Sequence, residues 1–183
     1  MDAIQDIDEF LFRLVNEDFS SEFLDVVMPM ITHVEFWLPF YIIGVIAMAV
    51  QMGWRSLWVV LFLVAIVAVA DQVSAGLIKD WVGRARPCHI FSDINLLVKC
   101  GVGKSFPSAH ATNNFAAAMF LTKVFPRKWA LWFFIAGMVA LSRVYIGVHY
   151  PIDIFSGAVL GVLIGYGFYL LYGLVVLRRR KNG

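Results

Sequence analysis

The chain has 183 residues, of which 61% are hydrophobic and only 15% are charged, and its formal net charge at pH 7 is +2. An ordinary soluble domain carries about 45–50% apolar and about 25% charged residues. The composition therefore excludes a water-soluble domain and indicates one integral membrane domain over residues 1–183. The small net charge gives no reason to expect a nucleic acid as partner.

Two short helices are expected in the N-terminal region, residues 1–34. Residues 2–15 place five apolar side chains on one helical face and most charged ones on the other, which is typical of an amphipathic helix in the membrane interface. Ser20 or Ser21 can cap a second helix that runs to about residue 32. The acidic start of the chain argues against a cleavable signal peptide. The five apolar residues are Ile4, Ile7, Phe10, Leu11 and Leu14.

Five apolar segments follow, and each approaches the roughly 20 residues that a helix needs to cross the bilayer core. They predict an all-α fold, an integral membrane helical bundle over residues 35–177. A sixth span would have to fall within residues 20–32, so the sequence leaves five or six transmembrane helices open. The segments are 36–50, 56–78, 108–125, 129–146 and 152–177.

The basic residues predict the orientation of these spans. The tail, residues 178–183, is basic and indicates a cytoplasmic C-terminus, because cytoplasmic loops carry an excess of Lys and Arg. Counting back from the tail places the segment 79–107 and the turn 147–151 on the extracytoplasmic side of what we expect to be a bacterial inner membrane. These outward segments are also basic, against the same rule, and we infer that they bind an anion.

Two patterns concern packing rather than chemistry. Cys88 and Cys100 lie in one outward polar segment, where a disulfide and two free thiols fit the sequence equally well. Gly157, Gly161 and Gly165 form a stripe of small residues at four-residue spacing. We interpret this stripe as close packing inside one bundle rather than as a dimer interface, so no oligomer is required.

Three polar patches lie at the outward ends of the spans, and the predicted topology brings them to one face. They are residues 79–87, 107–110 and 142–153. Three of their cations stand beside the membrane surface, where they can hold a multiply charged oxyanion. These are Lys79, Arg86 and Arg143.

The second patch is expected to begin a helix. Ser108 and Ala109 would present free backbone amides, which bind phosphate at a helix N-terminus. His110 lies in the same turn, within reach of the bound anion. Asn114 follows four residues later and therefore shares its helical face.

The third patch places a histidine and a carboxylate four residues apart, at His149 and Asp153. The carboxylate can accept a hydrogen bond from one ring nitrogen and leave the other free to attack. Asp71 precedes Lys79 by two turns and is a candidate to support it, since carboxylates inside the membrane tend to be functional. Arg84, His33 and His89 lie outside this pattern.

In these motifs the chain resembles the type 2 phosphatidic acid phosphatase superfamily. The family signature reads K-x6-R-P, then P-S-G-H, then S-R-x5-H-x3-D. It is matched by Lys79 with Arg86-Pro87, by Pro107-Ser108-Ala109-His110, and by Ser142-Arg143 with His149 and Asp153. Ala109 replaces the usual glycine, which keeps the backbone amide and requires that the position not need a positive φ.

The resemblance implies the role of each residue. His149 would be the nucleophile that forms a phosphohistidine, Asp153 would orient it, and His110 would protonate the leaving oxygen. The phosphoryl oxygens would be held by Lys79, Arg86, Arg143, Ser108 and the Ala109 amide. Neither a metal nor another cofactor is expected, because the cations nearby make a metal site at His110, His149 and Asp153 electrostatically poor.

Several readings stay open at this point. The same site could pass the phosphoryl group to a second lipid instead of water, or the chain could be a channel or transporter built around Asp71 and the glycine-rich last helix. A haloperoxidase that binds vanadate is disfavoured by the short hydrophobic chain. Among lipid substrates, undecaprenyl diphosphate is slightly favoured over phosphatidylglycerol phosphate, phosphatidate and a lipid A phosphate. Membrane lipids are the other expected partners.

Overall fold

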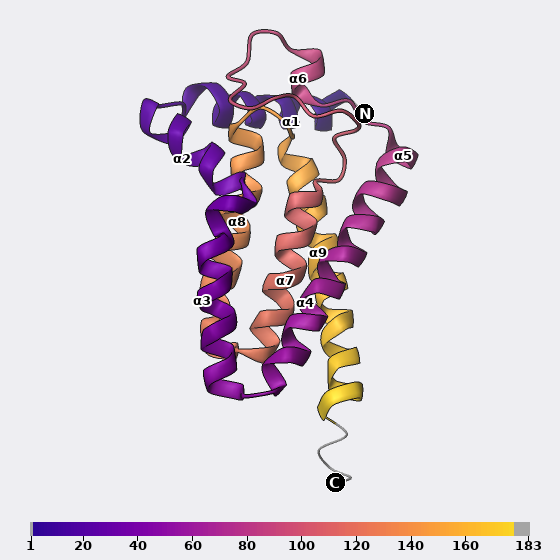
Figure 1. The fold of residues 1–183 in the computed structure, drawn as a ribbon. Coiled ribbons are helices and arrows are strands. Elements are labelled where there is room, and N and C mark those ends of the chain that lie inside the picture. The colour runs from indigo at the N-terminus through magenta and orange to yellow at the C-terminus, as the bar shows by residue number, and fades with distance from the viewer. Residues whose placement is uncertain (1, 178–183) are drawn as a thin grey trace.

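The computed structural model describes residues 2–177, and every regular element in that range is helical. The all-α class predicted from the sequence is therefore confirmed for the described residues. The long helices run side by side along one axis (Figure 1). The basic tail predicted at residues 178–183 lies outside the described residues.

Three helical segments are long and apolar enough to cross a membrane. They are Val34–Met52, Arg55–Ile90 and Pro151–Val176. Their elements, with η for a 3-10 or π-helical turn, are α3 (Val34–Met52), α4 (Arg55–Asp71), η2 (Gln72–Ile78), α5 (Lys79–Val82), α6 (Pro87–Ile90), α9 (Pro151–Tyr172) and η4 (Gly173–Leu177). Together with the composition, they define an integral membrane protein.

Two shorter helices, α7 (Ala109–Val124) and α8 (Trp129–Tyr145), run beside these three and are joined by η3 (Pro126–Lys128). The region of the sixth candidate span forms α2 (Glu22–Thr32), which has 11 residues. This is too short for the roughly 20 residues that a crossing helix needs. The bundle therefore has five long helices in the described range, and the number that cross the membrane stays a prediction.

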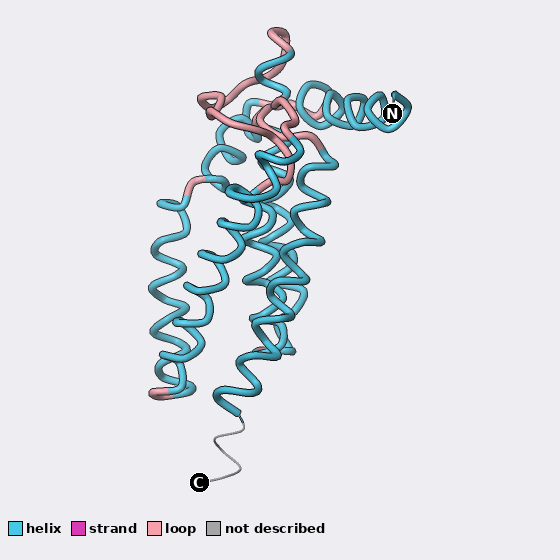
Figure 2. The backbone as a smooth tube through the Cα atoms, turned by 90° about the vertical axis from the view of Figure 1, so that its right-hand side faces the viewer, coloured by secondary structure: helices cyan, strands magenta, loops and turns pink. Residues whose placement is uncertain are grey.

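The N-terminal helices lie across one end of the bundle. Helix α1 (Asp2–Arg13) continues into η1 (Leu14–Asp18) and runs roughly at right angles to the long helices. Figure 2 shows α1 projecting sideways beyond the bundle, at the end where most of the loops gather. One side of α1 packs on the protein through the buried Phe12, while Ile4, Ile7 and Phe10 are exposed. The seating of this apolar side in the membrane interface stays a prediction.

Helix α7 packs in the centre of the bundle, against α9, α8 and α4. Its contact with α9 is unusually close because α9 presents a stripe of glycines, Gly157, Gly161 and Gly165. A Cβ atom on Gly157 would lie 2.6 Å from the carbonyl oxygen of Ser108, and the other two glycines meet the α7 backbone in the same way. The stripe therefore packs inside one bundle, as the sequence predicted.

The connection between α5 and α7 forms the outer loop at the α1 end of the bundle. Of the two outcomes that the sequence left open for its cysteines, the structure contains the disulfide between Cys88 and Cys100. Asn16, fully buried in η1, fixes this loop to the end of α8. Its Nδ2 donates to the carbonyl oxygens of Asn95 at 2.8 Å and Tyr145 at 2.6 Å. The loop is thus held against the helices that carry the polar patches.

Candidate active site

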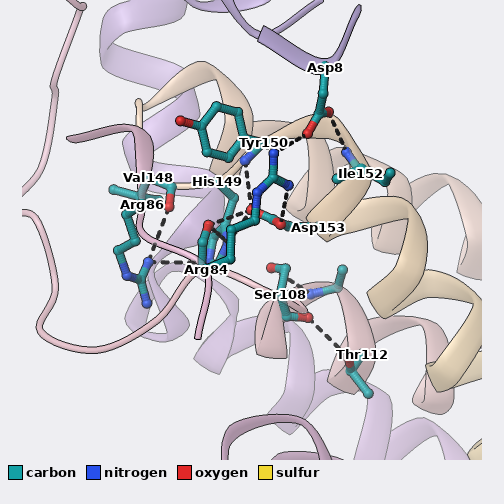
Figure 3. A network of polar contacts seen from close by, with 12 residues as sticks. Asp8, Arg84, Arg86, Ser108, Thr112, Val148, His149, Tyr150, Ile152 and Asp153 are labelled. Carbon is teal, nitrogen blue, oxygen red and sulfur yellow. Dashed lines mark hydrogen bonds and ion pairs between the residues drawn. The ribbon is translucent and has the colours of Figure 1, made fainter. Parts of the chain in front are cut away.

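Residues from four separate parts of the chain meet at the end of the bundle near α1: α1 itself, the loop after α5, the start of α7 and the turn into α9 (Figure 3). The turn between α8 and α9 supplies His149, and the first turn of α9 supplies Asp153. Pro151 is the first residue of α9, and Asp153 accepts a hydrogen bond from the Tyr150 amide at 2.9 Å. Proline at the first helical position and an acidic residue at the third are both typical of a helix start. The local sequence thus begins α9 where the histidine and the carboxylate face each other.

His149 is 1% exposed, and the groups around its ring decide which nitrogen carries the proton. Its Nε2 lies 3.3 Å from Nη1 of Arg86. A guanidinium only donates hydrogen bonds, so Nε2 must be the acceptor and Nδ1 must carry the hydrogen. Nδ1 lies 3.5 Å from Oδ2 of Asp153. The lone pair of Nε2 therefore faces the cationic side of the site, as a nucleophile requires.

Ser105 links His149 to Asp153, and sequence reasoning missed it. Its Oγ lies 3.3 Å from His149 Nδ1 and donates a short hydrogen bond to Asp153 Oδ2. The hydroxyl can accept the Nδ1 hydrogen and donate its own to the carboxylate, which forms a continuous chain of hydrogen bonds. No periodicity or helix start in the sequence marks this residue, because it lies in an irregular loop two residues before Pro107.

Burial lowers the pKa of His149 to about 4, the charges of Arg86 and Arg143 act in the same direction, and Asp153 opposes them. The neutral imidazole is therefore the stable form at pH 7. A neutral histidine is the form that attacks phosphorus, so this environment prepares the ring for nucleophilic chemistry.

Arg84, placed outside the pattern in the sequence interpretation, belongs to the site. Its Nη1 donates to Asp153 Oδ1 at 2.8 Å, and its Nη2 donates to Asp8 Oδ2 at 2.6 Å. The interpretation was wrong because both partners are distant in the sequence. Asp8 comes from α1 in the N-terminal region, where no motif was found, so no local pattern could connect the three residues.

Of the three predicted cations, Arg86 is buried and Arg143 is half-buried. Arg86 is 7% exposed and donates through Nη1 to the Val148 carbonyl oxygen at 3.2 Å, while Arg143 donates to Thr32 Oγ1 at 2.7 Å. The Nε–H group of each arginine is buried without an acceptor in the described part of the chain. Buried donors of this kind favour an anion. Lys79, at the start of α5, lies near enough to interact electrostatically with Arg86 and Arg143.

The start of α7 lies beside these cations. Ser108 is buried, and its amide donates to the Asp153 carbonyl oxygen at 3.0 Å, which ties α7 to α9. The Ala109 amide has no acceptor among residues 2–177. Within the same range only glycines have a positive φ, so alanine fits here without strain. His110 follows in the same turn, where the charges of Arg86 and Arg143 act on it.

The two candidate supporting residues contribute less directly. Asn114 donates through Nδ2 to the His110 carbonyl oxygen at 2.9 Å, so it contacts the backbone of the histidine rather than its ring. Asp71 is exposed and makes no hydrogen bond to Lys79 in the described structure. The charge of Asp71 still acts on Lys79, and its supporting role stays a prediction.

The site does not resemble a metal centre in its donor set. Both oxygens of Asp153 already accept hydrogen bonds, from Arg84 on one side and from Ser105 and the Tyr150 amide on the other. The arginines nearby would repel a cation. Elsewhere among the described residues, Cys88, His89 and Cys100 lie within ligand distance of one another, but both sulfurs are used in the disulfide.

The helical bundle carries, at one end, a cluster of histidines, arginines and a buried carboxylate. The sequence model of the PAP2 superfamily matches residues 36–176, and the chain belongs to that family. It is a phosphatase that acts on phosphate esters.

Relatives with assigned activities are similar over most of the chain. The lipid A 4'-phosphatase of Bacteroides thetaiotaomicron is 32% identical over 180 residues, which cover 94% of this chain and 78% of that protein. Phosphatidylglycerophosphatase B of Bacillus subtilis is 32% identical over 188 residues, which cover 93% of this chain and 84% of that protein. Both names describe phosphatases that act on lipids.

Two crystal structures have the same fold. The PAP2-type phosphatidylglycerolphosphate phosphatase from Bacillus subtilis superposes with a TM-score of 0.72 and 27% identity, covering 96% of this chain and 89% of that one. The LpxE protein of Aquifex aeolicus gives a TM-score of 0.69 and 24% identity, covering 88% of this chain and 94% of that one. The bundle described above is therefore the fold of membrane PAP2 phosphatases.

Proposed function

We propose that the protein hydrolyses a phosphomonoester or diphosphate of a membrane lipid through a phosphohistidine on Nε2 of His149, without a metal ion. The observation that carries the proposal is the orientation of the His149 ring. Nε2 lies 3.3 Å from Nη1 of Arg86, while Nδ1 faces Ser105 and Asp153. A phosphoryl group held by the cations would therefore meet the free lone pair.

The reaction has two steps. The lone pair of Nε2 attacks phosphorus and the bond to the lipid oxygen breaks. His110 enters this step as the imidazolium, which the bound phosphoryl anion stabilises, and donates its proton to that oxygen. Water then attacks the phosphohistidine, His110 takes a proton from the water, and inorganic phosphate leaves with His149 neutral again. Arg86, Arg143 and Lys79, with the Ala109 amide, hold the phosphoryl oxygens, whose charge grows in each transition state. Asp153 stabilises the imidazolium that forms during attack.

Two lipids should be compared first as substrates. Undecaprenyl diphosphate suits a compact chain with an outward site, and an undecaprenyl-diphosphatase of Sulfolobus acidocaldarius is 34% identical over 59% of this chain and 50% of that protein. Lipid A 4'-phosphate is favoured by the similarity to the Bacteroides enzyme over 94% of this chain. The assay that decides between them measures phosphate release by the purified, detergent-solubilised protein. Both lipids are tested, together with phosphatidylglycerol phosphate and phosphatidate.

Trapping the intermediate tests the mechanism. Wild-type protein mixed briefly with labelled substrate should yield an acid-labile phosphoenzyme. His149→Ala should yield none on any substrate, whereas His110→Ala should yield it with nitrophenyl phosphate, whose leaving group needs no proton. Removing a general acid typically costs about 10²–10⁴-fold on a poor leaving group. The exposed His89, changed to alanine, is the matched control. Phosphoenzyme in His149→Ala would overturn the assignment.

The absence of a metal is tested separately. Activity should survive EDTA, and vanadate, which adopts the five-coordinate geometry of the phosphoryl transition state, should inhibit. Loss of activity in EDTA that magnesium restores would refute the metal-free mechanism.

We also propose that the site faces the extracytoplasmic side of a bacterial inner membrane. Val102, 97% exposed in the outer loop, and Lys128, exposed at the opposite end of the bundle, provide a matched pair for cysteine substitution. In intact cells an impermeant thiol reagent should label Val102→Cys and leave Lys128→Cys unlabelled. The reverse labelling would invert the topology.

A further inference from the structure

Helix α1 brings one buried carboxylate to the catalytic end of the bundle. Asp8 is 4% exposed, although Asp6 on the same helix is exposed. Both oxygens of Asp8 have partners: Oδ2 accepts from Arg84 at 2.6 Å, and Oδ1 accepts from the Ile152 amide at 2.8 Å (Figure 3). Burying a carboxylate is unfavourable unless it is paired. These two contacts are therefore the reason that the side chain can occupy this place.

Arg84 is held in one orientation from several directions. Its two terminal nitrogens bind different carboxylates, Asp8 and Asp153, and its guanidinium lies 4.0 Å above the ring of Tyr150. Its carbonyl oxygen accepts a hydrogen bond from the Ser105 amide at 2.7 Å. A planar guanidinium can bridge two carboxylates in this way, whereas the single ammonium of a lysine cannot reproduce the geometry.

The two oxygens of Asp153 are supported differently. Oδ2 contacts Ser105 and the Tyr150 amide, while the hydrogen bond to Oδ1 comes from Arg84. If Arg84 shifted, the carboxylate could rotate, and Oδ2 would leave its place beside Nδ1 of His149. Asp8 opposes such a shift because it holds Arg84 and the backbone at the start of α9 together.

We propose that Asp8 is a positioning residue for catalysis, which acts through Arg84 to hold Asp153 in the geometry that orients His149. The proposal rests on the proposed function, because the reaction that it supports is attack by His149. Asp8 touches neither the phosphoryl group nor His149 in this arrangement, so its effect falls on the chemical step and not on substrate binding.

The first test compares Asp8→Asn with Asp6→Asn, the same change at an exposed position of the same helix. Asp8→Asn should lower kcat about tenfold, less than the roughly 10²-fold that a misplacement of about 1 Å can cost. KM should change by less than about twofold, because no ground-state contact with substrate is lost. Asp6→Asn should match wild type. Equal kcat in the two variants would overturn the proposal.

A double-mutant cycle tests whether Asp8 acts through Arg84. In an Arg84→Gln background, Asp8→Asn should have almost no further effect on kcat, because coupled residues are not additive. If the two substitutions lowered kcat by independent factors that multiply in the double variant, the proposal that Asp8 acts through Arg84 would be refuted. Should Asp8→Asn fail to accumulate in the membrane, Arg84→Lys provides the second variant. Arg84→Lys keeps the positive charge, but its kcat should fall about as far as that of Asp8→Asn. Full activity would refute the claim that the guanidinium must bridge Asp8 and Asp153.

A spectroscopic readout separates this proposal from the proposed function. In protein labelled with ¹⁵N-histidine, the His149 signals, assigned by their loss in His149→Gln, should show hydrogen on Nδ1 only. Asp8→Asn should shift them toward a mixture of tautomers, and Asp6→Asn should not. If no lipid substrate were hydrolysed but the Asp8→Asn spectrum still changed as expected, only the proposed function would be refuted. Activity in wild type with identical shifts in both variants would refute only the positioning role.

Discussion

Replacing Gly157 by alanine should disable the site, although no polar residue of the site is substituted. The added Cβ would lie 2.6 Å from the Ser108 carbonyl oxygen, 3.0 Å from the Ala111 Cβ and 3.2 Å from Thr112 Oγ1. All three atoms belong to the backbone or to a short, stiff side chain, so no flexible group can move aside. The first turn of α7 must therefore move away from α9.

The size of the movement follows from the contact distance. Ordinary van der Waals contact begins near 3.4 Å, so the Ser108 oxygen must retreat from 2.6 Å by about 0.8 Å. This shift strains the hydrogen bond from the Ser108 amide to the Asp153 carbonyl oxygen, now 3.0 Å long. It also displaces the Ala109 amide and His110 from the phosphoryl group. A misplacement of roughly 1 Å can cost about 10²-fold in rate, and overpacking costs about 1–3 kcal/mol of stability.

Two other glycines of α9 provide the controls. Gly167 has open space where its Cβ would stand, so Gly167→Ala should keep both activity and stability. Gly165 meets the Ala116 backbone about 12 Å further along the helix axis, so Gly165→Ala should lower stability with a much smaller loss of kcat. The assays are phosphate release per folded enzyme and thermal unfolding in detergent. Full activity in Gly157→Ala would refute the argument that α9 sets the position of the α7 start.

Further outcomes follow from the same geometry. Ser105→Ala should lower kcat about tenfold yet less than Asp153→Ala, since it removes one of the hydrogen bonds to the Asp153 carboxylate, and a hydrogen bond to a charged group is worth about 1.5–3 kcal/mol; an unchanged kcat would show that Ser105 adds nothing. Because burial lowers the pKa of His149 to about 4, the nucleophile stays neutral as the pH falls and protonates only near that value. The acid limb of kcat/KM should therefore lie far below the ordinary imidazole value of 6.5, and a limb near 6.5 would contradict the environment described. Reducing the disulfide between Cys88 and Cys100, which lie 12 residues apart, should lower stability by about 3 kcal/mol in thermal unfolding, and an unchanged midpoint would contradict this.

The sequence predicted the helical class, because it follows from local patterns, and the same kind of pattern indicated the candidate phosphate-binding residues. Apolar runs of span length mark the long helices, and the motif spacing identifies Arg86, Arg143 and His149. The roles assigned to these residues await the experiments above. For Cys88 and Cys100 the sequence allowed either a disulfide or two free thiols. Only the three-dimensional path of the loop brings the two sulfurs together in a disulfide.

The residues that sequence reasoning missed are those that hold the others in place. Ser105 stands in an irregular loop, where no period applies. Arg84 lies outside the motif pattern, and its partners lie 69 and 76 residues away. Asp8 looked like part of the polar face of an amphipathic helix. Its burial depends on where α1 crosses the bundle, which no property of residues 2–15 alone determines.

A series of paired polar side chains runs from Arg86 to α1. Arg86 faces neutral His149, followed by the anionic Asp153, the cationic Arg84 and the anionic Asp8. Removing one member of a buried ion pair is far more costly than the pair is stabilising, because the remaining charge is left without a partner. Asp153, at 0% exposure, pairs with Arg84 and accepts further hydrogen bonds from Ser105 and the Tyr150 amide, which together offset the burial of its carboxylate. Asp8 in turn pairs with Arg84. In the proposed attack, the imidazolium that forms on His149 would meet a carboxylate whose orientation is maintained from the side opposite Arg86.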